Sequence, residues 1–142
     1  AMGPDGEKAF DVVMEGQTVE AKAALADSKR RITKFPFLIG RDSRKRDTDV
    51  FYLNDLFVKE ERPYLVSRNH MAISHENGGI WVVDRGSAFG TIVNGKEIGR
   101  KRGVVRVRLD QEENQVVLGP ATSRYIFLLT VIPKEYPPWR NP

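Results

Sequence analysis

Residues 67–95 read SRNHMAISHENGGIWVVDRGSAFGTIVNG, and this stretch decides the fold. Its apolar run Ile80-Trp81-Val82-Val83 is typical of a strand covered on both faces. Turn residues bound the run at Asn77-Gly78-Gly79 and at Gly86. Further on, Asn94-Gly95 is a strong signal for a two-residue hairpin. The stretch therefore predicts short antiparallel strands that are joined by tight turns.

The flanking sequence repeats this pattern. Apolar and polar side chains alternate over residues 105–109 and 125–131, and residues 35–39 form another apolar run. We also expect residues 19–25 to form a strand, because their apolar side chains recur at every second position. Many short strands separated by turn residues predict an all-β protein, in which two sheets pack face to face as a β-sandwich.

Composition limits the protein to a few classes. The chain has 142 residues, of which 40% are hydrophobic and 30% charged, enough for one domain with a real core. It has no cysteine, which excludes disulfides and thiolate metal sites, and no apolar run long enough for a membrane helix. No signal peptide is visible, so we expect a cytoplasmic location, or a nuclear one in a eukaryote. The net charge of +4 weakly favours an anionic partner.

We predict three segments. Residues 1–17 are expected to be an N-terminal extension, made of an expression remnant and a short segment that reads as a helix between Asp5 and Gly16 or as a short strand. Residues 18–133 form the domain, within which residues 42–50 are nearly all polar and predict an exposed loop. Residues 134–142 are a proline-rich tail or linker, which suggests one domain of a larger protein.

Four short pieces of the sequence form a recognisable set. In chain order they are Gly40-Arg41, Ser67-Arg68-Asn69-His70, Asp84-Arg85-Gly86-Ser87 and Gly90-Thr91-Ile92-Val93-Asn94-Gly95. Together they resemble a known family, the forkhead-associated (FHA) domains. The resemblance runs from about Val19 to Val131. It implies a β-sandwich of two twisted, mainly antiparallel sheets with recognition loops at one end. It also implies a non-enzymatic module without a cofactor, which binds proteins or peptides phosphorylated on threonine by a Ser/Thr kinase.

The resemblance places a phosphate site on three residues. Arg41 ends an apolar strand, where its planar guanidinium can grip two phosphate oxygens, and Ser67 offers a hydroxyl donor. Arg68 adds a second cation, and its family counterpart often joins the contact. As alternatives, Arg41 is an ordinary solvated arginine, and Arg68 belongs to a surface charge network with residues 60–62.

The remaining residues of the motif divide into contacts and supports. The resemblance implies peptide contacts from the loop Ala88, Phe89, Gly90 and Thr91, and structural support of the site from Gly40, His70, Asp84, Ser87, Asn94 and Gly95. The asparagine is expected to brace the recognition loop. The usual family loop reads serine-threonine-asparagine-glycine-threonine, and here alanine and phenylalanine replace its second and third residues. We therefore expect phosphate binding to persist and selectivity for flanking residues to change.

Rival functions remain open. A Ser67–His70–Asp84 triad lacks a nucleophile elbow and an oxyanion loop, so we expect no catalysis. We expect no metal site from His70, His75 and Glu76 either, because strand alternation separates the two histidines, and His75 is expected at an exposed turn. The other candidates are a phosphate-independent interaction module and, less favoured, a basic domain that binds nucleic acid through residues 29–31, 44–46 and 100–102.

Overall fold

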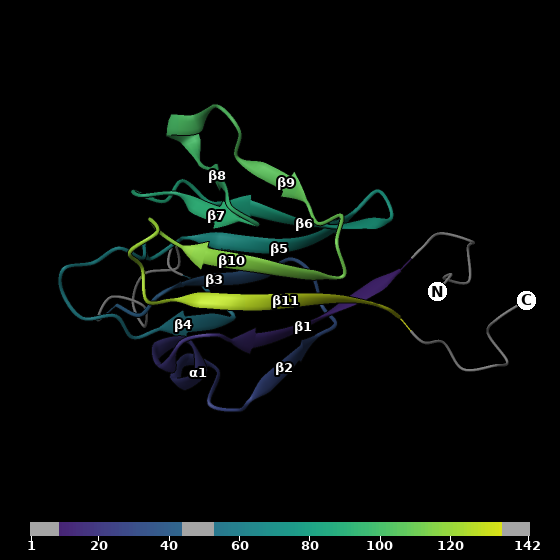
Figure 1. Ribbon diagram of the computed structural model, residues 1–142, viewed down its shortest axis with the longest axis horizontal. Helices are drawn as coiled ribbons and strands as arrows, with labels where there is room; N and C mark the ends of the chain where they lie inside the picture. Colours follow the sequence, from purple (N-terminus) through teal and green to yellow (C-terminus); the bar gives the residue numbers. More distant parts are fainter. Residues whose placement is uncertain (1–8, 44–52, 135–142) are drawn as a thin grey trace, which may run out of the picture.

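The computed structural model describes residues 9–43 and 53–134 and contains two sheets that face each other (Figure 1). The first sheet has six strands in the order β2-β1-β11-β10-β7-β8, and the second has five in the order β4-β3-β5-β6-β9. Only the β3–β4 pair is parallel among the strand pairs of the described residues. The prediction of a sandwich of two mainly antiparallel sheets is confirmed.

The strands are short and spread over the whole described chain. The first sheet contains β1 (Phe10–Gly16), β2 (Lys29–Ile32), β7 (Thr91–Val93), β8 (Lys96–Ile98), β10 (Glu113–Leu118) and β11 (Ile126–Pro133). The second contains β3 (Phe37–Arg41), β4 (Leu56–Val58), β5 (Met71–Glu76), β6 (Gly79–Asp84) and β9 (Arg106–Arg108). A helix, α1 (Val19–Leu25), and a 3-10 turn, η2 (Arg100–Arg102), complete the described elements.

The core lies between the sheets, where alternation along each strand directs apolar side chains inward. Phe127 and Leu129 of β11 are fully buried, as are Ile73 of β5 and Val82 of β6. In β6 the outward Trp81 is covered on its face by the Arg106 guanidinium, 4.1 Å from the ring centre, rather than by a further layer. Close packing of these side chains is what fixes the relative position of the strand ends that carry the loops.

Residues 19–25 form α1, so the predicted strand there is wrong. Thr18 caps the helix, since its hydroxyl accepts a hydrogen bond of 3.2 Å from the Ala21 amide. Ala21 and Leu25, four residues apart, are buried together on one helix face, whereas Val19 is 80% exposed. Residues at every second position therefore do not share a face, and the alternation of small apolar residues was accidental.

Residues 10–16 form β1, which lies inside the first sheet between β2 and β11. Val12 pairs with Val131 and Met14 with Leu129, and the Val12 and Met14 side chains belong to the core. Of the two interpretations of this segment, the short strand is confirmed and the helix is wrong. The predicted boundary between residues 17 and 18 lies between β1 and the rest of its sheet. One of the two partners of β1, the strand β11, lies more than a hundred residues away, so this pairing cannot be placed from local sequence.

Other expectations fall partly outside the described residues. The structure does not describe residues 44–52 and 135–142, which hold most of the predicted exposed loop and of the proline-rich tail. Within the described part, no helix is long and apolar enough to cross a membrane.

Candidate functional site

The end of β3 meets the loop that carries Ser67. The Arg41 amide donates a hydrogen bond of 2.9 Å to the Ser67 carbonyl, which places the two residues side by side. Gly40 makes this approach possible, because a Cβ at its position would lie 1.9 Å from the Arg68 carbonyl oxygen. Only glycine fits between strand and loop here, so the Gly40-Arg41 pair has a steric origin.

The Arg41 side chain is held by contacts from several directions. Its Nε donates to the Val66 carbonyl at 3.0 Å and its Nη1 donates to the Asp42 carbonyl at 3.4 Å. The Tyr64 ring lies under the guanidinium, with 3.8 Å from Cζ to the ring centre. An arginine has five N–H donors, and the two hydrogen bonds within the described residues leave three of them available. Arg41 is therefore an ordered cation with spare donors.

His70 fixes the loop from beneath. It is fully buried; its Nδ1 accepts a hydrogen bond of 3.0 Å from the Ser67 amide, and its Nε2 lies 2.8 Å from the Gly90 carbonyl. An acceptor at Nδ1 requires the proton on Nε2, so the ring is the neutral Nε2–H tautomer. Burial, the largest cause, lowers the pKa of His70 from its ordinary value of 6.5. The imidazole links the two loops of the site.

Asp84 organises the second loop. One carboxylate oxygen accepts the amides of Gly86 and Ser87 at 3.0 and 2.9 Å, and the other accepts the hydroxyls of Ser87 and Thr91 at 2.6 and 2.8 Å. Ser87 Oγ also accepts the Gly90 amide at 2.9 Å. These bonds close residues 84–91 into a compact loop whose polar groups are satisfied internally.

Within this loop, Thr91 and Gly90 differ from their expected role as peptide contacts. Thr91 is 1% exposed, and its hydroxyl hydrogen goes to Asp84. Gly90 uses its amide and its carbonyl within the site, and a Cβ there would lie 2.8 Å from the Ile98 carbonyl oxygen. Thr91, the first residue of β7, points inward, and Gly90 makes its hydrogen bonds within the site, so both residues build the loop. Ala88 and Phe89 remain at the exposed tip.

The tip of the loop touches the phosphate-site candidates directly. The Ala88 amide donates a hydrogen bond of 2.9 Å to Ser67 Oγ. The Ser67 hydroxyl hydrogen has no acceptor among the described residues, so it is available to a ligand. Arg68 is the next residue in the chain, and its carbonyl accepts the Asn54 side-chain amide at 2.8 Å. Arg41, Ser67 and the Ala88 tip thus converge, whereas for Arg68 the described hydrogen bond involves the main chain.

Arg85 hydrogen-bonds two asparagines next to the site, a role that the sequence does not predict. Its Nη1 donates to Asn54 Oδ1 at 2.6 Å and its Nη2 donates to Asn69 Oδ1 at 3.2 Å. Burial is the largest cause that lowers the pKa of Arg85, and the nearby Asp55 opposes that shift. The residue stood within a quoted motif but received no role. Its partner Asn54 gave no signal, because it belongs to none of the four pieces.

The loop before Ser67 also supports Arg41, which its sequence does not predict. Glu60 accepts the amides of Leu65 and Val66 at 2.9 and 2.8 Å through a single carboxylate oxygen, so it shapes the backbone that binds Arg41. The sequence alone predicts only a surface charge network for residue 60. Tyr64 stacks on Arg41. The sequence predicts no role for it, because local sequence does not indicate a contact between residues 23 positions apart.

Asn94 supports a different part of the molecule than expected. It adopts a positive φ of 50° in the β7–β8 turn, and Gly95 beside it has a φ of 82°. Its side chain donates to Asn114 at 2.9 Å and accepts the Gln115 amide at 2.9 Å, both on β10. The Asn94 side chain therefore hydrogen-bonds β10, and not the recognition loop as expected. The bonds hold the hairpin to the middle of the first sheet.

The histidines considered for catalysis and for a metal site make other contacts in the structure. His70 bonds the Ser67 amide and not its hydroxyl, so the imidazole is not placed as a base for that oxygen. The described residues contain no group of three or more metal-ligating side chains. His75 lies in β5 rather than in an exposed turn; its Nε2 accepts the Phe10 amide at 3.1 Å, and its ring lies near Phe10 and Phe35. That histidine ties β1 to the second sheet.

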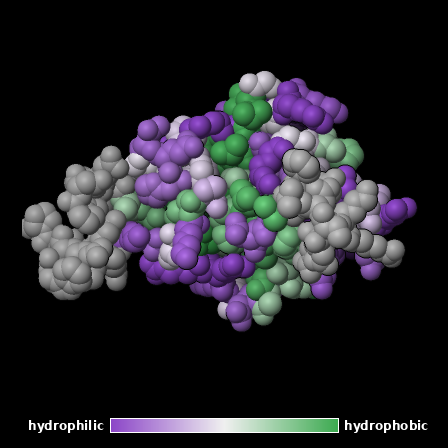
Figure 2. Space-filling view, turned by 180° about the vertical axis from the view of Figure 1, so that it is seen from behind, coloured by the Kyte–Doolittle hydropathy of each residue, from purple (hydrophilic) through white to green (hydrophobic). Residues whose placement is uncertain are grey.

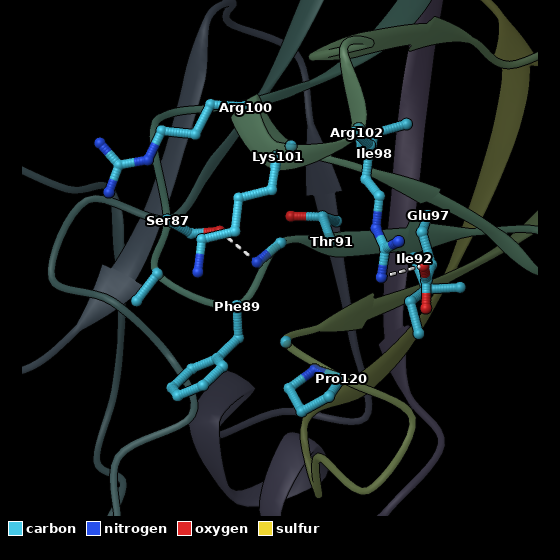
Figure 3. Close-up of a pocket in the computed structure, with 14 residues that line it drawn as sticks. Ser87, Phe89, Thr91, Ile92, Glu97, Ile98, Arg100, Lys101, Arg102 and Pro120 are labelled. Atoms are coloured by element: carbon cyan, nitrogen blue, oxygen red, sulfur yellow. Dashed lines mark hydrogen bonds and ion pairs between the residues drawn. The ribbon is translucent and has the colours of Figure 1, made fainter.

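The recognition loop also lines a pocket of about 370 Å³ (Figure 3). Phe89 and Pro120 stand at its edge, and Lys101 of η2 extends toward the loop. Its lining also includes Ser87, Ala88, Gly90, Thr91, Ile92, Glu97, Ile98, Gly99, Arg100, Arg102 and Gly119. The Ser87–Gly90 segment therefore belongs to two features, because it lines this pocket and its Ala88 amide contacts Ser67 of the Arg41–Ser67 cluster.

Comparison with known proteins identifies the class. A family model described as FHA domain matches residues 37–119, more than half of the chain. The match spans β3 through β10, which includes Arg41, Ser67, Asp84 and the recognition loop. The chain belongs to the FHA domain family. Comparison with curated proteins finds no match.

Solved FHA structures share the fold at low identity. FHA-1 of Mycobacterium tuberculosis Rv1747 is 20% identical, with a TM-score of 0.58 over 86% of this chain and 96% of that one. The FHA domain of an Arabidopsis thaliana hypothetical protein is 15% identical, with a TM-score of 0.61 over 96% and 94%. Mycobacterium tuberculosis EmbR, in complex with a low-affinity phosphopeptide, is 15% identical, with a TM-score of 0.56 over 96% of this chain and 28% of that one. At these identities the comparison establishes the fold.

Proposed function

We propose that this domain is a non-enzymatic module that binds proteins or peptides phosphorylated on threonine by a Ser/Thr kinase. The observation that carries the proposal is the convergence of Arg41 and Ser67, two residues far apart in sequence, with unused donors. Family membership and the phosphopeptide bound to the structurally similar EmbR support it. We further propose that the domain acts as a monomer in the cytoplasm, or in the nucleus in a eukaryote.

The chemistry of the cluster suits a phosphate dianion. A phosphothreonine carries about −1.5 to −2 charges and three acceptor oxygens. Arg41 can supply a fork of N–H donors whose position is fixed by Tyr64 and Val66, so little conformational entropy is lost on binding. Ser67 can donate its hydroxyl, and we assign Arg68 to the same anion as a second cation. Ala88 and Phe89 would contact the peptide beside the phosphate.

Substitution of Arg41 tests the proposal. We expect Arg41→Ala to weaken binding of a phosphothreonine peptide at least tenfold, because a charge-assisted hydrogen bond contributes about 1.5–3 kcal/mol. Fluorescence anisotropy with a degenerate phosphothreonine library measures this, and far-UV circular dichroism checks the fold. The matched control is Arg30→Ala on β2, whose guanidinium lies over Phe37, away from the cluster. Equal affinity of wild type and Arg41→Ala would remove Arg41 from the site.

A phosphate-independent interaction module is the second candidate. Phe89 is 56% exposed at the loop tip, where an apolar side chain can contact a partner without phosphate. Phosphatase treatment of the partner separates the two: binding that survives it favours this candidate.

Nucleic-acid binding finds less support. In β2, Lys29 pairs with Glu15 and Arg31 with Asp11, so two cations of that cluster are partly neutralised. Residues 44–46 lie outside the described residues. On the face seen in Figure 2, hydrophilic and apolar areas are interspersed rather than arranged in a continuous hydrophilic stripe. Steep loss of affinity with salt for any oligonucleotide sequence would revive this candidate.

A further inference from the structure

The pocket beside the recognition loop combines an apolar edge with unpaired cations. Phe89, Ile92 and Pro120 contribute apolar surface, and η2 adds Arg100 and Lys101. Its volume of about 370 Å³ lies at the small end of the range for ligand pockets, about 300–1,000 Å³. A cavity of this size has room for one large side chain of a bound peptide.

The charges of the pocket are asymmetric. Arg102 forms an ion pair of 2.6 Å with Glu97, so these two charges cancel. Among the described residues, Arg100 and Lys101 form no ion pair, and both are exposed. Figure 3 shows the Lys101 side chain extending toward the loop of Phe89, whereas Arg100 points to the outer side. The mouth of the pocket is therefore positive.

The pocket is built on a rigid turn. The Gly99 amide donates to the Val104 carbonyl at 2.7 Å and the Arg102 amide donates to the Gly99 carbonyl at 3.0 Å, which closes residues 99–104. Gly99 and Gly103 have φ values of 147° and 74°, a conformation that favours glycine. The cations are thus carried on a preformed turn, a condition that reduces the cost of binding.

We propose that this pocket selects the sequence around the phosphothreonine: it takes a bulky apolar side chain of the bound peptide, while Lys101 pairs with an adjacent acidic residue. The inference rests on the proposed phosphopeptide binding. It explains how the domain can bind with alanine and phenylalanine at the loop tip, because the contact moves from the peptide backbone to a side chain. The Ala88 amide lies 2.9 Å from Ser67 Oγ, so one peptide can reach both the cluster and the pocket.

The experiment begins with wild-type protein and a phosphothreonine library that is degenerate on both sides. We expect selection of an acidic residue next to a bulky apolar one. The selected peptide is then compared with two versions, one with the acidic residue replaced by its amide and one with the apolar residue replaced by alanine. Affinities are measured for wild type, Lys101→Glu, Phe89→Ala and Lys96→Glu. Lys96 is exposed on β8 and does not line the pocket, so the last variant controls for net charge.

Two changes are expected. Lys101→Glu lowers the affinity for the acidic peptide about three- to tenfold, because exposed ion pairs are individually modest. Its affinity for the amide version stays within twofold of wild type. Phe89→Ala lowers the affinity for the selected peptide about tenfold, so that this peptide no longer binds more tightly than the version with alanine. Lys96→Glu changes neither preference.

The outcomes separate the two proposals. Arg41-dependent phosphopeptide binding without flanking preference, or a preference that Lys101→Glu and Phe89→Ala leave intact, would overturn the pocket and preserve the proposed function. Failure of wild type to distinguish phosphorylated from dephosphorylated peptides would overturn both. A dimer seen by sedimentation and dissociated by Phe89→Ala would assign the pocket to a second copy of the chain and overturn the inference.

Discussion

The recognition loop takes part in two regions that differ in construction, the Arg41–Ser67 cluster and the pocket beside η2. On the Arg41 side, Gly40 allows the strand and the loop to approach closely, and His70 and Asp84 accept hydrogen bonds from the backbone of the loops. The Arg41 guanidinium itself is held by the Val66 carbonyl. On the η2 side, the cavity is lined by an exposed phenylalanine and by two cations that form no ion pair with any described residue. The first side can hold a fixed chemical group, since its geometry is overdetermined, and the second can vary with the partner at little cost to the fold.

The largest expected effect breaks the first side. Asp84→Ala removes four hydrogen bonds to a buried carboxylate, so we expect the free energy of unfolding to fall by about 3 kcal/mol. Urea denaturation followed by tryptophan fluorescence measures it. Asp110→Ala, at an exposed position, is the control and should change stability by less than about 0.5 kcal/mol. A loss below 1 kcal/mol for Asp84→Ala would contradict the bracing role.

A smaller loss is expected where strand and loop meet. Gly40→Ala places a methyl group 1.9 Å from the Arg68 carbonyl, and we expect a stability loss of about 2 kcal/mol together with displacement of Ser67 from Arg41. Gly86→Ala is the comparison, because a Cβ at that position meets nothing within 4 Å although its φ of 83° is strained. Phosphopeptide affinity should fall much further in the first variant. Equal affinities would mean that the close approach is unimportant.

Acidification should lower the stability of the domain through His70, on the Arg41 side. The folded domain keeps His70 neutral and lowers its pKa below 6.5, so the unfolded chain binds the extra proton first. Stability is therefore fully present above pH 6.5 and declines as the pH falls toward the lowered pKa, by at most about 1.4 kcal/mol per pH unit. Denaturant titrations between pH 7.5 and about 5 test this. The His70-dependent part of the decline should disappear in His70→Asn and persist in His75→Asn.

The smallest expected effect concerns the clamp on Arg41. Tyr64→Leu removes the aromatic face 3.8 Å from the guanidinium, and we expect about a fivefold loss of phosphopeptide affinity with little change in stability. Tyr64→Phe should retain wild-type affinity, because the ring and not the hydroxyl makes this contact. Arg62→Ala serves as the control, since Arg62 lies farther from the same ring, at 5.6 Å. A loss in Tyr64→Phe equal to that in Tyr64→Leu would assign the effect to the hydroxyl.

Local sequence determined the strands that carry their own signals. Alternation and turn residues located β6, β9 and β11, because side-chain direction in a strand is set by local geometry. The four motif pieces located the family and the loops, and the matching family model confirms that identification. The same local reasoning failed for α1, where small apolar residues fit either period and the Thr18 cap decided the structure.

Tertiary structure alone decided which motif residues face outward. Thr91 and Ala88 lie three residues apart in one loop, yet Asp84 draws the first inward and Ser67 meets the second at the tip. Tyr64 and Asn54 joined the site only because packing brought distant segments together. Sequence therefore specified the donors and the turns, which are properties of single residues, whereas the pairing of those donors depends on distances that exist only after the two sheets pack.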